Sequence, residues 1–405
     1  MRDYTTERSP FPGISRTVFL VGLVSLFTDL SSEMIYPLMP AFILLLGGGA
    51  LDVGAIEGLA ETTASIGKLF SGWVTDRVGK RKVLVVLGYG ISSLSRPLVA
   101  LALAPWNIIL IRFIDRIGKG IRTSPRDLLI TDSTVETERG RAFGFHRAMD
   151  HAGAAGGTLL AYLLLLWASK AHSHGALLPQ YRMIFAAAAV PAAAAVLTLV
   201  LGVREIPPKS RPKAPPALTI RPFTARFKGY LAILLLFTLA NSSDMFLLWA
   251  AGMTGVPPLH YPLLWALLHV VKSAISTPGG SISDRLGRRT FIVAGWLIYG
   301  AVYLGFGLAR EQYQIWLLFA AYGLFNGLTE GAEKALVTDL TEEATRGAAF
   351  GVYNFTAGIG LLPASMLMGY LLNTSGKTIA FGVDAALAGL AALALFLWLG
   401  PRKQR

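Results

Sequence analysis

One apolar stretch of the sequence carries six charged side chains at helical spacing: Arg112, Asp115, Arg116, Lys119, Arg122 and Arg126. An α-helix places residues at this spacing on one arc of about 140°. Arginine forks bind carboxylate or phosphate oxygens through paired hydrogen bonds, so the stripe predicts a site for an anionic group. The alternative for Arg122 and Arg126 is that they already lie at the end of the apolar environment.

Carboxylates one helical turn apart form the second group of candidates. Asp29 is followed by Glu33, and Glu57 by Glu61. A carboxyl group that leaves water beside an arginine can take up and release a proton, so both pairs predict proton-binding chemistry. Permanent ion pairing with the arginine stripe is the alternative for the first pair, and a place at an outer opening is the alternative for the second. Further candidates on other apolar stretches are Arg147, Asp150, Asp244 and Glu330.

Histidines add little to this chemistry. His146 and His151 could relay protons, but hydrogen bonding alone would also explain a buried histidine. His172 and His174 flank a single serine, and two histidines without a third ligand do not predict a metal site. We therefore expect no bound metal.

The elements that must position these groups are long and apolar. Hydrophobic residues make up 53% of the 405 residues and charged residues 15%, whereas a soluble domain carries roughly 25% charge. A run of about 20 apolar residues crosses a bilayer as one helix. We expect an all-α polytopic membrane protein with spans at 16–43, 51–75, 83–104, 107–130, 142–168, 182–203, 229–254, 261–282, 290–309, 313–336, 348–373 and 378–399.

A repeated motif divides these spans into two halves. GWVTDRVGKR at 72–81 is matched by GSISDRLGRR at 280–289, and RGRAFG at 139–144 by RGAAFG at 346–351. Internal repeats at one spacing are typical of secondary transporters. We expect two six-helix bundles, 1–203 and 229–405, joined by a basic, proline-rich linker at 204–228.

Charge asymmetry predicts the orientation of the spans. The loops after even-numbered spans, the linker and the C-terminus are basic, whereas the loops after odd-numbered spans are short and mostly uncharged. Lys and Arg concentrate on the cytoplasmic side of membrane proteins. Both termini are therefore expected in the cytoplasm and the protein in the cell (inner) membrane. Basic residues confined to short loops do not favour nucleic-acid binding.

The doubled motif and the twelve spans resemble the major facilitator superfamily along essentially the whole chain. The resemblance implies alternating access around a cavity lined mainly by spans 1, 4, 7 and 10. It also implies cytoplasmic latches, for which tight turns and topology anchors are the alternative. The motif residues are Gly72, Asp76, Arg77, Gly79 and Arg81 in the first copy, and Gly280, Asp284, Arg285, Gly287 and Arg289 in the second.

The expected function is proton-coupled export of a small drug-like or metabolite solute. The glycine-rich fifth span, with Gly153, Gly156 and Gly157, partly resembles the antiporter motif of exporters. A carrier of organic anions or metal chelates is the alternative favoured by the arginine stripe. A membrane-embedded enzyme or a non-transporting receptor is a more distant alternative, because no hydrolase, zinc-protease or nucleotide-binding motif is present. We expect no enzyme activity and no cofactor, a proton gradient as energy source, and a monomer whose partners are lipid, solute and protons.

Overall fold

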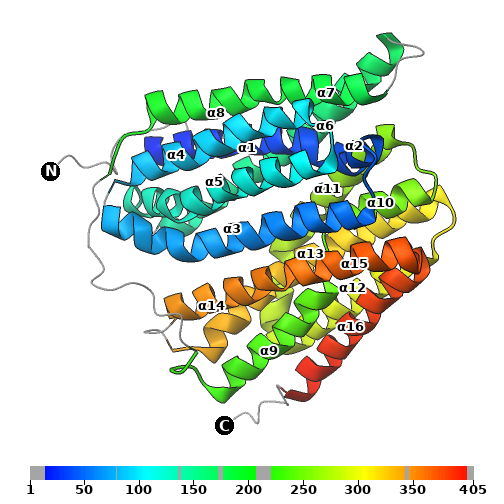
Figure 1. The fold of residues 1–405 in the computed structure, drawn as a ribbon. Coiled ribbons are helices and arrows are strands. Elements are labelled where there is room, and N and C mark those ends of the chain that lie inside the picture. Colours follow the sequence, from blue (N-terminus) through cyan, green and yellow to red (C-terminus); the bar gives the residue numbers. More distant parts are fainter. Residues whose placement is uncertain are drawn as a thin grey trace. The chain divides into compact units, whose positions relative to one another are not determined.

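The structure is a computed structural model that describes residues 14–78, 80–135, 138–171, 177–206, 220–342 and 346–398. Within these ranges it leaves undescribed the side chains at 72–73, 76–78, 140, 171, 276–286, 327, 330–331 and 346–347. The described residues form helices and no strand, as the sequence predicts (Figure 1). The chain divides into two compact units, one of residues 1–46 and 63–216 and the other of residues 47–62 and 217–405.

The helices of the first unit follow one another with short connections. They are α1 (Arg16–Ile35), η1 (Tyr36–Leu38), α2 (Met39–Leu45), α4 (Arg81–Ser95), η2 (Arg96–Leu101), α5 (Pro105–Asp132), α6 (Arg139–Ala171), α7 (Leu177–Ala187) and α8 (Ala189–Gly202). The unit also holds the second half of α3 (Ala50–Val78), whose first half belongs to the other unit.

The second unit repeats this order. Besides the start of α3, it holds α9 (Ala225–Ala240), α10 (Met245–Met253), η4 (Pro258–His260), α11 (Tyr261–Leu286), α12 (Arg288–Leu308), α13 (Gln312–Leu340), α14 (Arg346–Ile359), α15 (Leu361–Thr374) and α16 (Lys377–Trp398).

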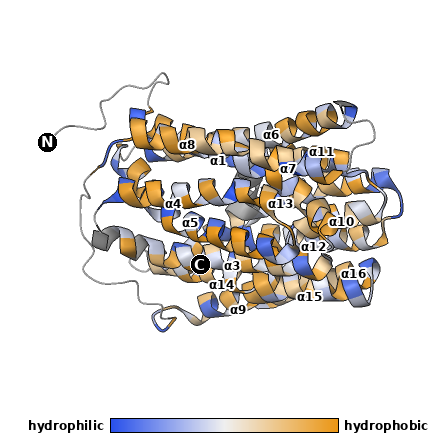
Figure 2. Ribbon diagram, turned by 45° about the horizontal axis from the view of Figure 1, so that its top comes forward, coloured by the Kyte–Doolittle hydropathy of each residue, from blue (hydrophilic) through white to orange (hydrophobic). Residues whose placement is uncertain are grey.

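Eight helical segments of the described chain are long and apolar enough to cross a membrane: Arg16–Leu45, Arg81–Leu101, Arg141–Lys170, Leu177–Gly202, Ala225–Met253, Arg288–Leu308, Ala348–Thr374 and Lys377–Trp398. Apolar residues run along most helices, and hydrophilic ones gather at several of their ends (Figure 2). The helices α3, α5, α11 and α13 have 26–29 residues, which is also long enough for a span. Counted as spans, they bring the number to the expected twelve.

Glycines set the distance between α1 and α6 in the first unit. A β-carbon on Gly153 would overlap the carbonyl oxygen of Leu26, and one on Gly157 would overlap that of Leu30. Small residues four apart let helices in a membrane approach closely. The glycine-rich fifth span is therefore at least a packing surface.

Both units interrupt their first span. In the first unit α1 ends at Ile35 and a 3₁₀ turn containing Pro37 leads into α2. In the second unit α9 ends at Ala240 and α10 begins at Met245. A break of this kind leaves backbone groups free to bind side chains.

Residues 47–62 group with the second unit, whereas the expected boundary placed them in the first half. Close packing on α15 explains the grouping, because a β-carbon on Gly54 would overlap the carbonyl of Ser365. Thr62 adds a hydrogen bond of 2.9 Å from its hydroxyl to the carbonyl of Gly358.

The described start of the linker is fixed to the first unit. Glu205 accepts a hydrogen bond of 2.8 Å from the backbone N–H of Arg81, and a second of 3.0 Å from that of Lys82. These N–H groups belong to the first turn of α4, where a carboxylate also interacts favourably with the helix dipole. Residues 207–219 of the linker lie outside the described chain.

Candidate functional site

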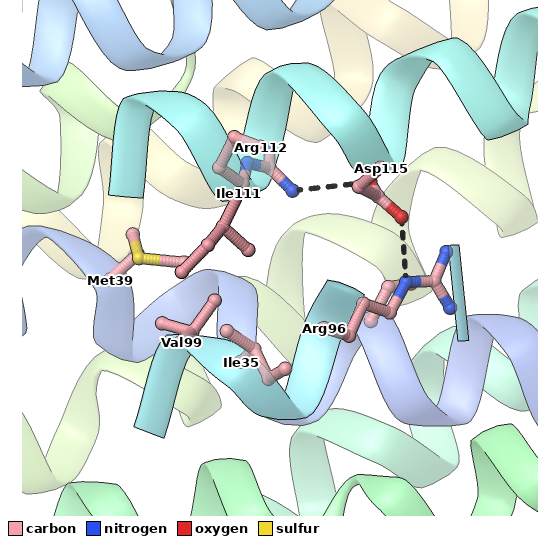
Figure 3. A pocket seen from close by; sticks show the side chains of 8 residues that line it. Ile35, Met39, Arg96, Val99, Ile111, Arg112 and Asp115 are labelled. Atoms are coloured by element: carbon pink, nitrogen blue, oxygen red, sulfur yellow. Dashed lines mark hydrogen bonds and ion pairs between the residues drawn. The ribbon is translucent and has the colours of Figure 1, made fainter. Parts of the chain in front are cut away.

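Asp115 is the centre of the charged cluster in the first unit. Its Oδ1 lies 3.1 Å from Nε of Arg96, and its Oδ2 lies 3.9 Å from Nη1 of Arg112 and 4.0 Å from Nε of Arg116. All four side chains are at least nine-tenths buried. Three guanidinium groups thus surround one carboxylate inside the helical bundle, and Figure 3 shows two of them, Arg96 and Arg112.

Arg96 connects three elements of this unit. It begins η2, pairs with Asp115 on α5, and donates from Nη1 to the carbonyl oxygen of Thr28 on α1 at 2.7 Å. Ser92 strengthens the same junction by donating to the carbonyl oxygen of Asp115 at 2.9 Å. The geometry of the cluster therefore depends on the packing of α1, α4 and α5 together.

A small cavity opens beside this cluster. It has room for about one water molecule and is lined by Ser32, Ile35, Met39, Arg96, Val99, Ile111, Arg112 and Asp115. Apolar side chains form one wall, and two guanidinium groups with a carboxylate form the other (Figure 3). The charged wall of this cavity offers hydrogen-bond donors to an anionic group.

The acids of α1 lie close to these arginines. The charged neighbours of Asp29 are Asp150, Glu33, Arg96 and Arg122. Both Asp29 and Glu33 are partly buried. The structure therefore brings together the acid pair and the arginine stripe that the sequence predicts to act jointly.

Asp150 on α6 belongs to this group and also lies beside His146 of the same helix. The Nδ1 atom of His146 lies 3.5 Å from Oδ2 of Asp150, and the histidine is buried. Arg147, the next candidate on the same helix, is exposed in the structure.

The inner end of the stripe differs from its centre. The guanidinium of Arg122 lies over the ring of Tyr89, 4.3 Å from its centroid, and the side chain is buried. Arg126 instead pairs with its neighbour Asp127 at 2.9 Å, and the Asp127 side chain is 42% exposed. Lys119 lies between the two parts and is partly buried.

A second group of predicted residues meets in the second unit. Asp244 accepts a hydrogen bond of 2.5 Å from the hydroxyl of Tyr322. Its charged neighbours are Lys272 on α11 and the two acids Glu57 and Glu61 at the start of α3. Glu57 is 2% exposed. The acid pair of the second span therefore lies near Asp244.

Arginines at the starts of α4 and α12 hold the helices that follow them, α5 and α13, in the same way. Arg81 forms an ion pair with Asp132 and donates to the carbonyl of Leu128. In the second unit it is Arg288 that pairs with Asp339, at 2.7 Å, and donates to the carbonyl of Ala335. Arg289, which the motif alignment selects, lies over the ring of Phe396 instead, 4.6 Å from its centroid.

Part of the predicted site lies outside the described residues. This holds for Gly79, His172 and His174 as a whole, for the surroundings of Gly72 and Gly280, and for the side chains of Asp76, Arg77, Asp284, Arg285 and Glu330. Gly287 is described and has a φ of +87°, a conformation that favours glycine at the turn before α12.

Two buried charged residues were missed by sequence reasoning. Arg96 is a single arginine in the expected third span, and Asp384 is the single acid of the expected twelfth. Each is at most 6% exposed. The sequence signal that could have identified them is their position within apolar spans, because an ionisable residue inside a span is a candidate functional residue by default.

Comparison with known proteins identifies the family. The sequence model of the Major Facilitator Superfamily matches residues 21–271 and 255–405, which together cover nearly the whole chain. The chain belongs to the major facilitator superfamily. It is therefore a multi-pass membrane transporter and not an enzyme.

Relatives and solved structures agree with this family. An uncharacterised MFS-type transporter of Methanocaldococcus jannaschii is 35% identical over 391 residues, covering 94% of this chain and 95% of its own. Multidrug resistance protein MdtH of Photorhabdus laumondii is 32% identical over 142 residues, or 35% of each chain. A mutant of the nucleoside transporter NupG superposes with a TM-score of 0.80 at 11% identity, over 95% of this chain and 100% of that one. This last likeness concerns the fold alone.

Each unit of this superfamily member thus carries its own buried polar centre. The first unit combines an anion-attracting arginine cluster with nearby carboxylates. The second combines acids, a lysine and tyrosine hydroxyls. Buried charges of this kind are costly in a membrane, which makes both groups candidates for a functional role.

Proposed function

We propose that this transporter exports a small drug-like or metabolite solute in exchange for protons. The observation that carries the proposal is the position of Asp29, whose charged neighbours include both acids and the arginines Arg96 and Arg122. When such a carboxylate is ionised, it can hold a cationic or hydrogen-bond-donating group of the solute, and protonation removes that interaction. Proton and solute then compete, which is the requirement for exchange.

Three observations support this proposal. The cavity of the first unit exposes Arg96, Arg112 and Asp115 on one wall. The glycines of α6 partly resemble the exporter motif. A relative matching about a third of the chain is named a multidrug resistance protein.

A carrier of organic anions or metal chelates is the second candidate. It is favoured by the three guanidinium groups that share Asp115, because a solute carboxylate could replace the carboxylate of Asp115 as their partner. The two candidates differ in what the solute must contain: the exporter needs an apolar body, and the anion carrier needs an anionic group.

The proposal includes location and assembly. We infer that the protein acts as a monomer in the cytoplasmic membrane with both termini in the cytoplasm. The basic loops after even-numbered spans support this orientation.

A ligand screen followed by flux measurements tests the proposal. Purified protein is mixed with pairs of compounds that differ only in a carboxylate or phosphate group, because a ligand of the native state raises the melting temperature. Compounds that stabilise are then loaded into proteoliposomes with and without an imposed pH gradient. Gradient-dependent exchange is expected. Equal flux with and without the gradient contradicts proton coupling, and stabilisation only by the anionic member of each pair favours the second candidate.

A further inference from the structure

Asp384 is a fully buried acid in the middle of α16 and plays no part in the site described above. Its relative exposure is 0%. Its Oδ2 lies 2.7 Å from the hydroxyl of Ser242, whereas its Oδ1 has no hydrogen-bond partner in the structure. Among the described residues it forms no ion pair. A carboxyl oxygen is thus buried with nothing to satisfy it.

The groups that surround Asp384 do not compensate a negative charge. Tyr299 and Tyr303 of α12 are its titratable neighbours, and Asp244 lies beyond Tyr303. Tyr299 donates its hydroxyl to the carbonyl of Ala240 at 2.7 Å, and Tyr303 directs its own toward the carbonyl of Ser242 at 3.5 Å. Neither hydroxyl donates a hydrogen bond to Asp384. The described residues of α9 and α15, which also pack on α16, bring it no charged group.

The repeat shows that the fold does not require this acid. Ser31-Ser32-Glu33-Met34 in the first unit corresponds to Ser242-Ser243-Asp244-Met245 in the second. Ser31 also donates to the last span of its unit, but its acceptor is the backbone carbonyl of Ala188, at 2.9 Å. The contact between this serine and the last span is therefore made to the backbone of an alanine in the first unit and to the side chain of a buried aspartate in the second.

The cost of burying a charge determines whether Asp384 is ionised or protonated. An ionised carboxylate whose hydrogen bonds come from Ser242 alone, with no cation beside it, is very unfavourable in a low-dielectric interior. A neutral carboxylic acid in the same place leaves only one carbonyl oxygen unsatisfied, which is a much smaller penalty. We propose that Asp384 is a proton-binding site of the second unit, occupied at neutral pH and separate from the acids of α1.

A proton fits this place better than a metal ion. Asp384 is enclosed, its helix packs closely on α12, and a sodium ion needs several oxygen ligands around an open space. A proton needs no additional space. Ser242 lies in the break between α9 and α10, so movement of this break is the step that can admit water to Asp384 and let the proton leave.

Infrared spectroscopy of the purified full-length protein tests the site without a known solute. The carbonyl-stretch band of a protonated carboxylic acid is separate from the bands of ionised carboxylates. At neutral pH we expect such a band in the native protein and its loss in Asp384→Asn. The matched control Asp339→Asn removes an acid that is paired with Arg288, and it should keep the band.

Two further measurements keep the inference falsifiable. Ser242→Ala retains the acid but removes its hydrogen-bond partner, so the band should move to higher frequency even if Asp384→Asn fails to fold. Because an amide resembles a protonated acid, Asp384→Asn should melt within a few degrees of the native protein.

An unchanged spectrum in both variants overturns the inference. So does a band that appears only after sodium is replaced by choline, because that result assigns the site to a sodium ion.

Discussion

Arg288 forms with Asp339 in the second unit the ion pair that Arg81 forms with Asp132 in the first. The correspondence extends to a second contact, since each arginine also donates to the carbonyl four residues before its aspartate. Both partners are shifted by 207 positions, whereas the motif around Asp76 and Asp284 is shifted by 208. The motif alignment therefore pairs Arg81 with Arg289, whereas the ion pairs make Arg288 the structural counterpart of Arg81.

The two pairs should differ in what they contribute to stability. The side chains of Arg81 and Asp132 are 5% and 9% exposed, whereas those of Arg288 and Asp339 are 27% and 38% exposed. Removing one partner of a buried pair costs about 3–5 kcal/mol, and an exposed pair is worth about 1 kcal/mol or less. We expect Arg81→Ala to lower the free energy of unfolding by the larger amount and Arg288→Ala by the smaller, measured by denaturation in detergent.

Lys80→Ala is the matched control, because it removes an exposed cation beside Arg81. It should leave stability nearly unchanged. Equal losses in Arg81→Ala and Arg288→Ala would show that burial does not control these pairs.

The fold was largely predictable because its signals are local. Long apolar runs, a repeated motif and basic loops each depend on residues close in sequence, and they indicate an all-helical membrane protein of this superfamily. The grouping of residues 47–62 with the second unit was not predictable, because it depends on contacts of Gly54 and Gly58 with residues some 300 positions away.

The sequence predicted which site residues share one face of a helix, but not which residues of other helices they contact. Helical spacing identified Arg112, Asp115 and Arg116, and the structure does bring them together. Spacing along one helix says nothing about which other helix supplies the next charge, so Arg96 was missed. For the same reason the sequence could not show that Glu57 lies near Asp244.

Glycines of α6 allow a test of helix packing. A β-carbon on Gly153 would overlap the backbone of Leu26, whereas one on Gly156 would be 3.6 Å from the side chain of Leu30, an ordinary contact. We expect Gly153→Ala to lower the melting temperature clearly. Gly156→Ala should change it little or raise it, because alanine favours a helix over glycine by about 1 kcal/mol. The same loss in both variants would mean that α1 and α6 do not pack through Gly153.

Orientation can be tested with single cysteines, because the chain has none of its own. Pro222 and Arg310 are exposed and lie in loops expected on opposite sides of the membrane. In intact cells an impermeant thiol reagent should label Arg310→Cys and should label Pro222→Cys only after the membrane is opened. Labelling of Pro222→Cys from outside would reverse the proposed topology.

Coupling should depend on the acids of α1. Asp29 has Glu33 and Asp150 as acidic neighbours and arginines within electrostatic reach. Asp29→Asn and Glu33→Gln remove the charge and the exchangeable proton while conserving volume. We expect at least one of them to abolish pH-gradient-driven flux in proteoliposomes while the stabilising compound still raises the melting temperature.

The matched control for coupling is Asp127→Asn, which removes an exposed acid from the inner end of α5 and should leave flux intact. Arg112→Lys should fail in transport as well, because an ammonium group cannot form the paired hydrogen bonds of a guanidinium. A variant that loses flux but still binds the stabilising compound has lost coupling, whereas a variant that no longer binds it has lost the site. If both acid variants still accumulate solute at the native level, protons are coupled elsewhere, and the acids around Asp244 become the next candidates.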